Sequence, residues 1–509
     1  MNILMVYPRY PVTFWSFKYS LKFVSKKTAF PPLGLLTVAA MLPTDWNLRL
    51  VDMNIRNLKG KDVKWADYVM ISAMLTQKES VEHVLKQCKR YGKKVIAGGP
   101  LFTALSEEYA PKIDHLILNE AERTLPLFLK DLAEGRPKKI YRADGFSDLA
   151  ETPIPRWDLI KVKDYATLLV KYSRGCPFNC EFCDVTILFG HRPRLKSAEQ
   201  FLEELQAIYD TGWRGSLFIV DDNFIGNKRA IKSMLPKVID WMKDHRHPFT
   251  LFTEASINLA EDDELIDLMV KASFDSVFVG LETPNEASLK ECSKMQNISL
   301  DVEAAIKKLQ KAGLEVLGGY IIGFDSDDES IFSRQIKFIQ ETGVVTAMVG
   351  LLQALPNTKL WQRLKEENRL ADCSTGNNTD GSLNFIPAMD RNTLMEGYRK
   401  LVKTIYSPKY YYQRVSRFLE NYNKPATRKK RITLRDLKAF FRSIFYLGVL
   451  GNGISQWYYW KIVIKSAAFH RRAFPETITL MVFGHHFRKV ANKIYRGSLL
   501  KDEQAAASG

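Results

Sequence analysis

Cysteine is scarce in this chain. The 509 residues include 6 cysteines and 8 histidines. A disulfide-stabilised fold uses more cysteines, spread more evenly over a shorter chain, so we exclude that class. Three of the six, Cys176, Cys180 and Cys183, fall within eight residues of one another. This clustering points to a metal centre rather than to disulfides. No motif recruits Cys88, Cys292 or Cys373.

Targeting and spanning segments are also missing. The first residues, MNILMVYPRYP, lack a basic stretch that leads into an apolar run and a small-residue cleavage site. The 18 residues of segment 443–460 carry no charge, but they include Gly448, Gly451 and Gly453, which disfavour a spanning helix. We expect a reducing, cytoplasmic compartment.

A chain of this length exceeds what one hydrophobic core organises, so we expect two or three domains in an α/β protein. Residues 1–145 alternate short apolar runs with stretches long enough for crossover helices, the rhythm of a doubly wound, Rossmann-like parallel sheet. The predicted strands are 3–7, 48–52, 68–72, 94–98 and 115–118. Ligands of such sheets bind at the carboxyl ends of the strands, where Ser72, Gly98 and Gly99 lie.

A proline-containing stretch within residues 146–162 predicts a linker. Residues 163–360 then show six strand–helix units. The predicted strands are 168–172, 216–220, 249–254, 276–281, 316–322 and 347–353. Six units predict a partial (β/α)6 barrel of the TIM type, whose active site forms at the carboxyl ends of the strands.

Residues 361–509 are predicted to form a mostly α-helical domain that is basic and rich in aromatic residues. Segment 401–509 holds 21 Lys and Arg against 5 Asp and Glu, which accounts for nearly all of the net charge of +17. A local basic segment implies a polyanionic partner, either nucleic acid or an anionic membrane. Segment 443–460 fits both an interfacial helix, with Trp and Tyr at headgroup depth, and a buried helix pair.

The three clustered cysteines follow the first predicted barrel strand with the spacing CxxxCxxC. Cysteine thiolates are the usual ligands of a cubane [4Fe–4S] cluster. Three thiolates leave one iron open for the amino and carboxylate groups of S-adenosylmethionine. The alternative is structural zinc, which prefers four ligands, and the nearest fourth candidate is His191. The ligand count favours the cluster.

The segment Cys176-x3-Cys180-x-Phe182-Cys183 resembles the signature of the radical SAM superfamily. The resemblance implies that Phe182 packs near the adenine of S-adenosylmethionine. It also implies that Asp221, Asp222 and Asn223, after the second barrel strand, contact the methionine amino group, for which carboxylates are suitable partners. Glu282 would approach the ribose or the methionine moiety. Gly319, Ile321 and Gly323 resemble the GxIxG backbone contact to adenine.

A doubly wound domain before such a barrel resembles the cobalamin-binding branch of this superfamily. Segment 31–34 (Pro-Pro-Leu-Gly), Ser72 and segment 98–100 (Gly-Gly-Pro) match its landmarks. The DxHxxG motif that supplies a histidine to cobalt is absent, and no histidine precedes His83. The resemblance implies cobalamin whose lower face has no protein ligand. The alternative is a degenerate domain that binds nothing.

The motifs resemble the hopanoid C-2 methylase group along nearly the whole chain. The resemblance implies methyl transfer to an unactivated carbon of a hydrophobic polycyclic lipid, an external electron donor and peripheral membrane contact through the C-terminal region.

Two rival hypotheses remain open. One is a radical SAM enzyme acting on RNA or a natural product without methyl transfer. RNA methylthiotransferases carry three further N-terminal cysteines, whereas this domain has only Cys88, so nucleic acid is not the expected partner. The other rival is a non-catalytic metal or cofactor scaffold.

Overall fold

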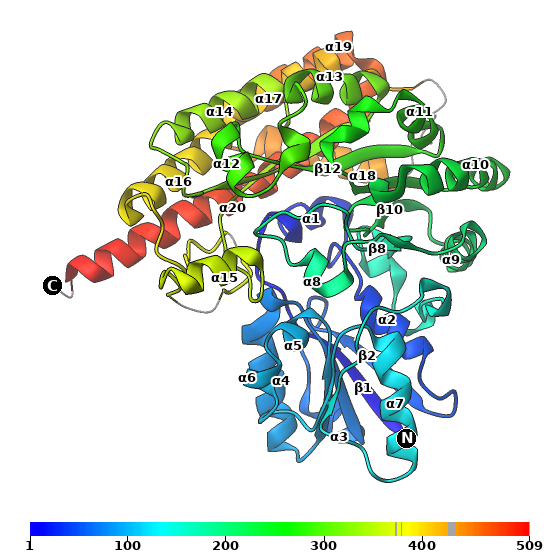
Figure 1. Cartoon of the computed structure of the whole chain (residues 1–509). Coiled ribbons are helices and arrows are strands. Elements are labelled where there is room, and N and C mark those ends of the chain that lie inside the picture. The colour runs from blue at the N-terminus through cyan, green and yellow to red at the C-terminus, as the bar shows by residue number, and fades with distance from the viewer. Residues whose placement is uncertain (372–373, 378, 426–433, 508–509) are drawn as a thin grey trace.

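Two parallel sheets and a layer of C-terminal helices make up the chain (Figure 1). The structure is a computed structural model and describes residues 1–371, 374–377, 379–425 and 434–507. Cys373 therefore lies outside the described residues. The N-terminal sheet forms the lower lobe in Figure 1, and the second sheet and the C-terminal helices together form the upper part of the molecule.

The N-terminal sheet has the order β2-β1-β3-β4-β5-β6, and all neighbouring strands are parallel. Its strands are β1 (Asn2–Tyr7), β2 (Asn47–Asp52), β3 (Tyr68–Ser72), β4 (Lys94–Gly98), β5 (His115–Ile117) and β6 (Ile140–Tyr141). Its helices are α2 (Leu33–Ala40), α3 (Gly60–Trp65), α4 (Lys78–Arg90), α5 (Pro100–Ala104), α6 (Ser106–Tyr109) and α7 (Ala121–Ala133). Buried residues pack in two clusters, as expected for a sheet covered by helices on both faces.

The second sheet has the order β14-β13-β12-β11-β10-β7, again with parallel neighbours. The strands are β7 (Leu168–Val170), β10 (Gly215–Ile219), β11 (Phe249–Glu254), β12 (Phe274–Glu282), β13 (Glu315–Ile322) and β14 (Ala347–Leu351). Its helices are α8 (Val185–Phe189), α9 (Ala198–Asp210), α10 (Lys228–Asp244), α11 (Asp263–Lys271), α12 (Glu286–Glu291), α13 (Val302–Ala312) and α14 (Ile331–Thr342). The predicted α/β fold with a partial barrel is confirmed.

Helix α13 shows how local sequence sets these elements. The Asp301 carboxylate accepts a hydrogen bond from the Ala304 amide at 3.0 Å and caps the first turn. Gly313 ends the helix with a φ of +97°, a conformation that glycine adopts without a steric penalty. Ala305, Ile306 and Leu309 form the buried face of the helix. Spacing of this kind made the barrel helices predictable.

The sequence did not predict three short strands. β6 has two residues at the edge of the N-terminal sheet, which is too short for a periodic pattern. β8 (Ser173–Arg174) and β9 (Arg194–Leu195) pair antiparallel and close a hairpin that contains the three clustered cysteines.

An N-terminal segment enters the open side of the barrel. β7 and β14 are the edges of the six-stranded sheet and do not pair among the described residues. The short turns η1 (Phe14–Ser16) and α1 (Leu21–Val24) occupy this side. The Trp15 ring lies 4.9 Å from that of Phe278 on β12, centroid to centroid, so a side chain from the first domain fills part of the barrel interior.

The C-terminal helices pack around the barrel. They are α15 (Lys359–Glu366), α16 (Arg391–Ile405), α17 (Pro408–Asn421), α18 (Leu434–Ser443), the π-helical turn η9 (Ile444–Val449), α19 (Gly453–Phe469) and α20 (Phe474–Ala507). Among them, α18 and α20 contact the N-terminal segment on the open side. Arg414 of α17 is fully buried and donates hydrogen bonds to the Gln340 side chain of α14 and to the Ile405 carbonyl, each at 2.7 Å. None of the helices in the described part of the chain is long and apolar enough to cross a membrane.

Candidate active site

The three clustered cysteines lie on the loop that β8 and β9 close. Gly175 begins this loop with a φ of +98°, and a Cβ atom there would lie 2.9 Å from the carbonyl oxygens of Gly190 and Arg192. The Cys176 amide donates to the Gly190 carbonyl at 3.2 Å. Glycine at position 175 therefore lets the two ends of the loop approach closely, and all three cysteines remain half-buried.

Asp221 and Asp222 follow β10 and hold the start of this loop. Asp221 accepts hydrogen bonds from the amides of Tyr172 and Ser173 at 2.8 and 2.9 Å and from the Ser173 hydroxyl at 2.6 Å. Burial raises the pKa of Asp221 to about 6. Asp222 accepts from the Gly175 amide at 3.0 Å and pairs with Lys171 at 3.6 Å. The contact predicted between these carboxylates and the methionine amino group stays a prediction.

Two side-chain amides approach the cysteine sulfurs. Asn223 Nδ2 lies 4.0 Å from Cys176 Sγ, and Gln296 Nε2 lies 3.9 Å from Cys180 Sγ. Hydrogen bonds to ligand sulfurs tune the potential of an iron–sulfur cluster. Asn223 was a predicted site residue, whereas no motif marked Gln296, because it lies 116 residues from its sulfur partner.

Glu282 ends β12 with a φ of +58° and forms an ion pair with Lys294 at 2.8 Å. Burial alone would lower the pKa of Lys294, but the Glu282 carboxylate and the thiolate forms of Cys180 and Cys183 raise it above its ordinary value. Lys294 therefore places a buried positive charge beside the cysteine loop. No sequence signal pointed to it.

Two of the three GxIxG residues face one cavity inside the barrel, the cluster-side cavity. Gly319 and Ile321 line it together with Trp15, Phe278 and Glu282, and about 600 Å³ of its space is not filled by atoms, part of it open to solvent. Gly323 does not line this cavity. Its amide donates to Asp327 at 3.0 Å. The Phe182 ring lies 6.3 Å from that of Phe324, centroid to centroid, so the predicted adenine neighbours lie at one end of the barrel.

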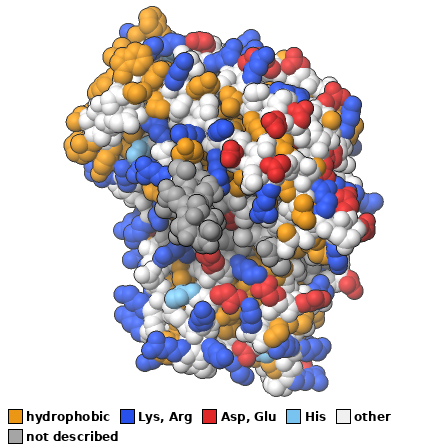
Figure 2. All heavy atoms as spheres, turned by 90° about the vertical axis from the view of Figure 1, so that its left-hand side faces the viewer, with side chains coloured by type: hydrophobic (Ala, Val, Ile, Leu, Met, Phe, Trp, Pro, Cys, Tyr) orange, Lys and Arg blue, Asp and Glu red, His pale blue; other side chains and the backbone are white. Residues whose placement is uncertain are grey.

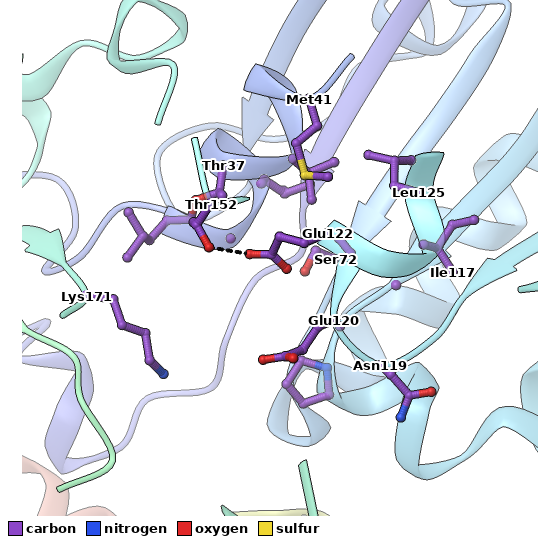
Figure 3. A pocket seen from close by; sticks show the side chains of 18 of the residues that line it. Thr37, Met41, Ser72, Ile117, Asn119, Glu120, Glu122, Leu125, Thr152 and Lys171 are labelled. Atoms are coloured by element: carbon purple, nitrogen blue, oxygen red, sulfur yellow. Dashed lines mark hydrogen bonds between the residues drawn. The ribbon is translucent and has the colours of Figure 1, made fainter. Parts of the chain in front are cut away.

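A second cavity, the interdomain cavity, lies between the first sheet and the barrel (Figure 3). About 1500 Å³ of its space is not filled by atoms, part of it open to solvent. Ser72, Gly98 and Gly99 line it, as do Lys171 and Arg174 of the barrel. Gly99 has a φ of +94°, and a Cβ atom there would lie 2.8 Å from Ser72 Oγ. At this point the cavity wall is the bare backbone of Gly99, and a side chain at position 99 would clash with Ser72.

Four charged residues join the two domains beside this cavity. Arg174 donates to Glu120 at 2.9 Å and to Glu122 at 2.7 Å, and Arg194 donates to Glu120 at 2.8 Å. Thr152 donates to Glu122 at 2.9 Å, as Figure 3 shows. Burial would raise the pKa of Glu120, but the hydrogen bonds from Arg194, the Ser147 amide and Arg174 outweigh it and lower the pKa to about 2.

Comparisons with known proteins match each of the three regions of the chain to a family. Family models for a B12 binding domain, the Radical SAM superfamily and a domain of unknown function match residues 23–129, 170–333 and 358–498. An uncharacterized methyltransferase of Synechocystis is 42% identical over 96% of this chain and 91% of its own length. The hopanoid C-2 methylase of Rhodopseudomonas palustris is 31% identical over 97% of this chain and 94% of its own length.

A solved structure agrees in fold. A radical S-adenosylmethionine methyltransferase from Kitasatospora setae, solved with cobalamin and a [4Fe–4S] cluster, has a TM-score of 0.62 and 13% sequence identity, and the match covers 94% of this chain and 99% of that one. Fold and matched domains define the class, a radical SAM enzyme with a B12-binding domain. Within it, the chain belongs to the cobalamin-dependent C-methyltransferase family that includes the hopanoid C-2 methylase.

Membership in this family implies a [4Fe–4S] cluster, S-adenosylmethionine and cobalamin as cofactors. The site fits them. Three thiols lie on one glycine-closed loop with amide donors beside two of the sulfurs. No three His, Cys, Asp or Glu side chains among the described residues converge on a single ion. Thiolates that each bind a different iron of a cubane do not need to converge in this way. The interdomain cavity offers cobalamin a wall that is formed by backbone at Gly99, and none of its described lining residues is a histidine.

We expect Gly99→Ala to abolish cobalamin binding, because the new methyl group would enter the cavity wall beside Ser72. Gly135→Ala is the matched control. Gly135 also has a positive φ, but a Cβ atom there meets no atom within 4 Å. The cobalamin content of reconstituted protein, measured by absorption, checks the prediction. Equal cobalamin content in the two variants would contradict it.

The depressed pKa of Glu120 predicts an acid-dependent domain contact. A carboxyl group whose folded pKa lies below its ordinary 4.5 contributes stability above pH 4.5 and loses it as the pH falls towards 2. Glu120→Gln should therefore melt below the wild type by a roughly constant gap, corresponding to about 3 kcal/mol at most, from pH 7 down to about 5. The gap should then narrow on further acidification.

Glu134→Gln serves as the comparison for this titration, because Glu134 pairs with an exposed arginine on the surface. Its melting temperature should follow the wild type throughout. A gap for Glu120→Gln that does not change on acidification would show that the carboxylate charge contributes nothing to the contact.

Proposed function

We propose that the chain methylates an unactivated carbon of a hopanoid-like polycyclic lipid and that it collects this substrate at a membrane surface. The observation that carries the proposal is an exposed apolar patch on the C-terminal helices. Support for the substrate class comes from the relative named hopanoid C-2 methylase, which aligns over nearly the whole chain.

The apolar patch consists of exposed side chains on α18, η9 and α19. Eleven of the twenty exposed large hydrophobic residues in the described part of the chain lie between residues 434 and 469. The patch residues with at least half of their surface exposed are Leu434, Phe441, Phe445, Val449, Leu450, Ile454, Trp457, Ile464 and Phe469. Figure 2 shows hydrophobic side chains gathered at the upper left, where these helices lie, with Lys and Arg beside them. Large apolar patches of this kind mark interaction sites.

The charge around the patch suits an anionic lipid surface. Lys438, Lys461, Arg471 and Arg472 are exposed near it, and the Lys461 ammonium lies 4.7 Å from the Trp457 ring centroid. Exposed apolar and aromatic side chains next to cations are the composition of an interfacial membrane anchor. The sequence left an interfacial helix and a buried pair as alternatives, and the exposure of Ile454 and Trp457 favours the first for α19.

We also propose roles for the predicted site residues. Cys176, Cys180 and Cys183 would hold the cluster. Those proposed for S-adenosylmethionine are Phe182, Asp221, Asp222, Asn223, Glu282, Gly319, Ile321 and Gly323, and those for cobalamin are Ser72, Gly98 and Gly99. The chemistry that the cofactors supply when bound is hydrogen-atom abstraction and methyl transfer. This chain's residues orient the reactants and exclude water from them.

Expression in a host that makes polycyclic lipids tests the substrate. We expect mass analysis of total lipid to show a new methylated polycyclic species, and Cys180→Ala to abolish it because the cluster is lost. Cys88→Ala, which removes a buried thiol of the N-terminal domain, should retain the product. Reconstituted enzyme that forms 5′-deoxyadenosine while the host lipids stay unmethylated would contradict the lipid substrate but not the enzyme class.

Flotation with vesicles tests the membrane contact. Wild-type protein should bind vesicles that contain phosphatidylglycerol, and the double variant Phe445→Glu/Trp457→Glu should lower the bound fraction by about tenfold. Leu127→Glu is the control, because Leu127 is 51% exposed on α7, away from the patch. Salt-sensitive binding to RNA without vesicle binding would favour a nucleic-acid partner instead.

A further inference from the structure

The barrel interior contains two cavities, and one side chain from the N-terminal segment borders both of them. Trp15 lines the cluster-side cavity and also a larger space towards the amino ends of the barrel strands. We call this second space the lower chamber. Its ring lies 4.9 Å from that of Phe278 and 6.2 Å from that of Phe218, centroid to centroid, and the Phe218 ring stacks at 4.3 Å on Phe252. Four aromatic rings thus form a partition across the barrel.

The lower chamber lies between the start of the barrel strands and α20. About 1360 Å³ of its space is not filled by atoms, part of it open to solvent. Phe17, Phe30, Leu317 and Phe483 belong to its largely apolar wall. A concave and largely apolar space with a few polar groups in its wall is the usual form of a small-molecule site.

The entrance that we infer for the lower chamber lies at α20, which packs against α18, a helix that carries part of the apolar patch. Thr479 of α20 lines the chamber and is exposed, so it marks the entrance. Ala439 of α18 also lines it, and two residues further on α18 presents Phe441, a patch residue that is 64% exposed. One helix therefore borders both the apolar patch and the chamber.

Carboxyl groups lie at one end of the chamber. Asp275, Glu315 and Glu476 line it, and one carboxyl oxygen of Glu476 is buried without a hydrogen-bond partner among the described residues. The other oxygen pairs with Lys424 at 2.7 Å. An orphaned buried acceptor is costly, and a hydroxyl or amino group of a ligand would satisfy it.

The turn that carries Trp15 is strained and anchored. Phe17 has a φ of +46°, which is rare for a bulky residue. His486 of α20 accepts from the Tyr19 amide at 3.3 Å and donates to the Phe14 carbonyl at 3.0 Å. The backbone on both sides of Trp15 is fixed to α20, so a change in the partition at this point would have to come from the Trp15 side chain.

We propose that the lower chamber binds the apolar ring body of the lipid substrate, with a hydroxyl or amino group at the carboxyl end. Trp15 turns aside when the lipid enters, and the reacting carbon then reaches the cluster-side cavity. The inference rests on the proposed lipid substrate and adds where the lipid lies and by which side it enters the barrel.

Narrowing the entrance tests the chamber. Thr479→Trp places a large ring at the opening, and Asn492→Trp adds the same ring at another exposed position of α20. The probe is a pentacyclic triterpene alcohol in detergent micelles, incubated with full-length reconstituted enzyme. We expect Thr479→Trp to lower both the retained probe and its methylation by about tenfold or more, with Asn492→Trp within about twofold of wild type. Formation of 5′-deoxyadenosine should persist in both variants.

The outcomes separate the chamber from the proposed function. Wild-type methylation that Thr479→Trp leaves unchanged would overturn the chamber as the lipid site and leave the lipid substrate standing. Wild-type enzyme that forms 5′-deoxyadenosine but neither retains nor methylates the triterpene would overturn both. The parent hydrocarbon, which lacks the hydroxyl group, should be retained less than the alcohol, and equal retention would overturn the polar end.

Tryptophan emission tests the movement of Trp15. The probe should change the emission of wild-type protein, and most of this change should be absent in Trp15→Phe, which keeps an aromatic ring in the partition. Probe retention by the variant is measured in parallel. An emission change of equal size in wild type and Trp15→Phe, with the probe retained by both, would show that Trp15 does not respond to the lipid.

Discussion

Residues 173–175 are held from two sides, and the position of the cysteine loop depends on this double attachment. Asp221 and Asp222 fix their backbone and the Ser173 hydroxyl from the barrel side. Glu120 and Glu122 bind the Arg174 side chain from the N-terminal domain. Buried ion pairs are tolerated when the charges balance and hydrogen bonds saturate them, and here two arginines meet two carboxylates that also accept from Ser147 and Thr152. The cysteine loop and the interdomain cavity are thereby fixed relative to one another.

The open side of the barrel is a second constraint. Six strands do not close on themselves, so both edge strands need cover. The N-terminal segment enters this side, and α20 packs over it through His486 and through Phe487, whose ring lies 5.6 Å from that of Phe14, centroid to centroid. Three regions that are far apart in sequence thus share one interface. The open side of the barrel is therefore closed by side-chain packing and not by backbone hydrogen bonds between strands. Side chains can change position more easily than paired strands, so this closure is compatible with a large substrate that enters from the side.

The positive charge of the C-terminal region divides into two kinds of residue. Arg414 is fully buried, and burial lowers its pKa. Its hydrogen bonds to Gln340 and Ile405 join α17 to the barrel, so this charge serves packing and is not available to a partner. Arg442 at the end of α18 donates to the Lys22 carbonyl at 3.0 Å and ties that helix to the N-terminal segment. Exposed cations such as Lys461 and Arg472 lie beside the apolar patch instead. Net charge alone could not separate these roles.

The sequence by itself determined where the strands fall along the chain, the placement of the cysteine loop after the first barrel strand and the glycines at the strand ends. These features are set by local periodicity, spacing and backbone conformation, and the predicted strands of both sheets are confirmed with small shifts at their ends. Only the tertiary structure decided that Arg174 binds Glu120 and Glu122, that Lys294 lies beside the cysteine loop and that Trp15 divides the barrel interior. Each of these contacts joins residues from different elements or domains. Their partners are selected by how strands and helices pack in space, which no local pattern records.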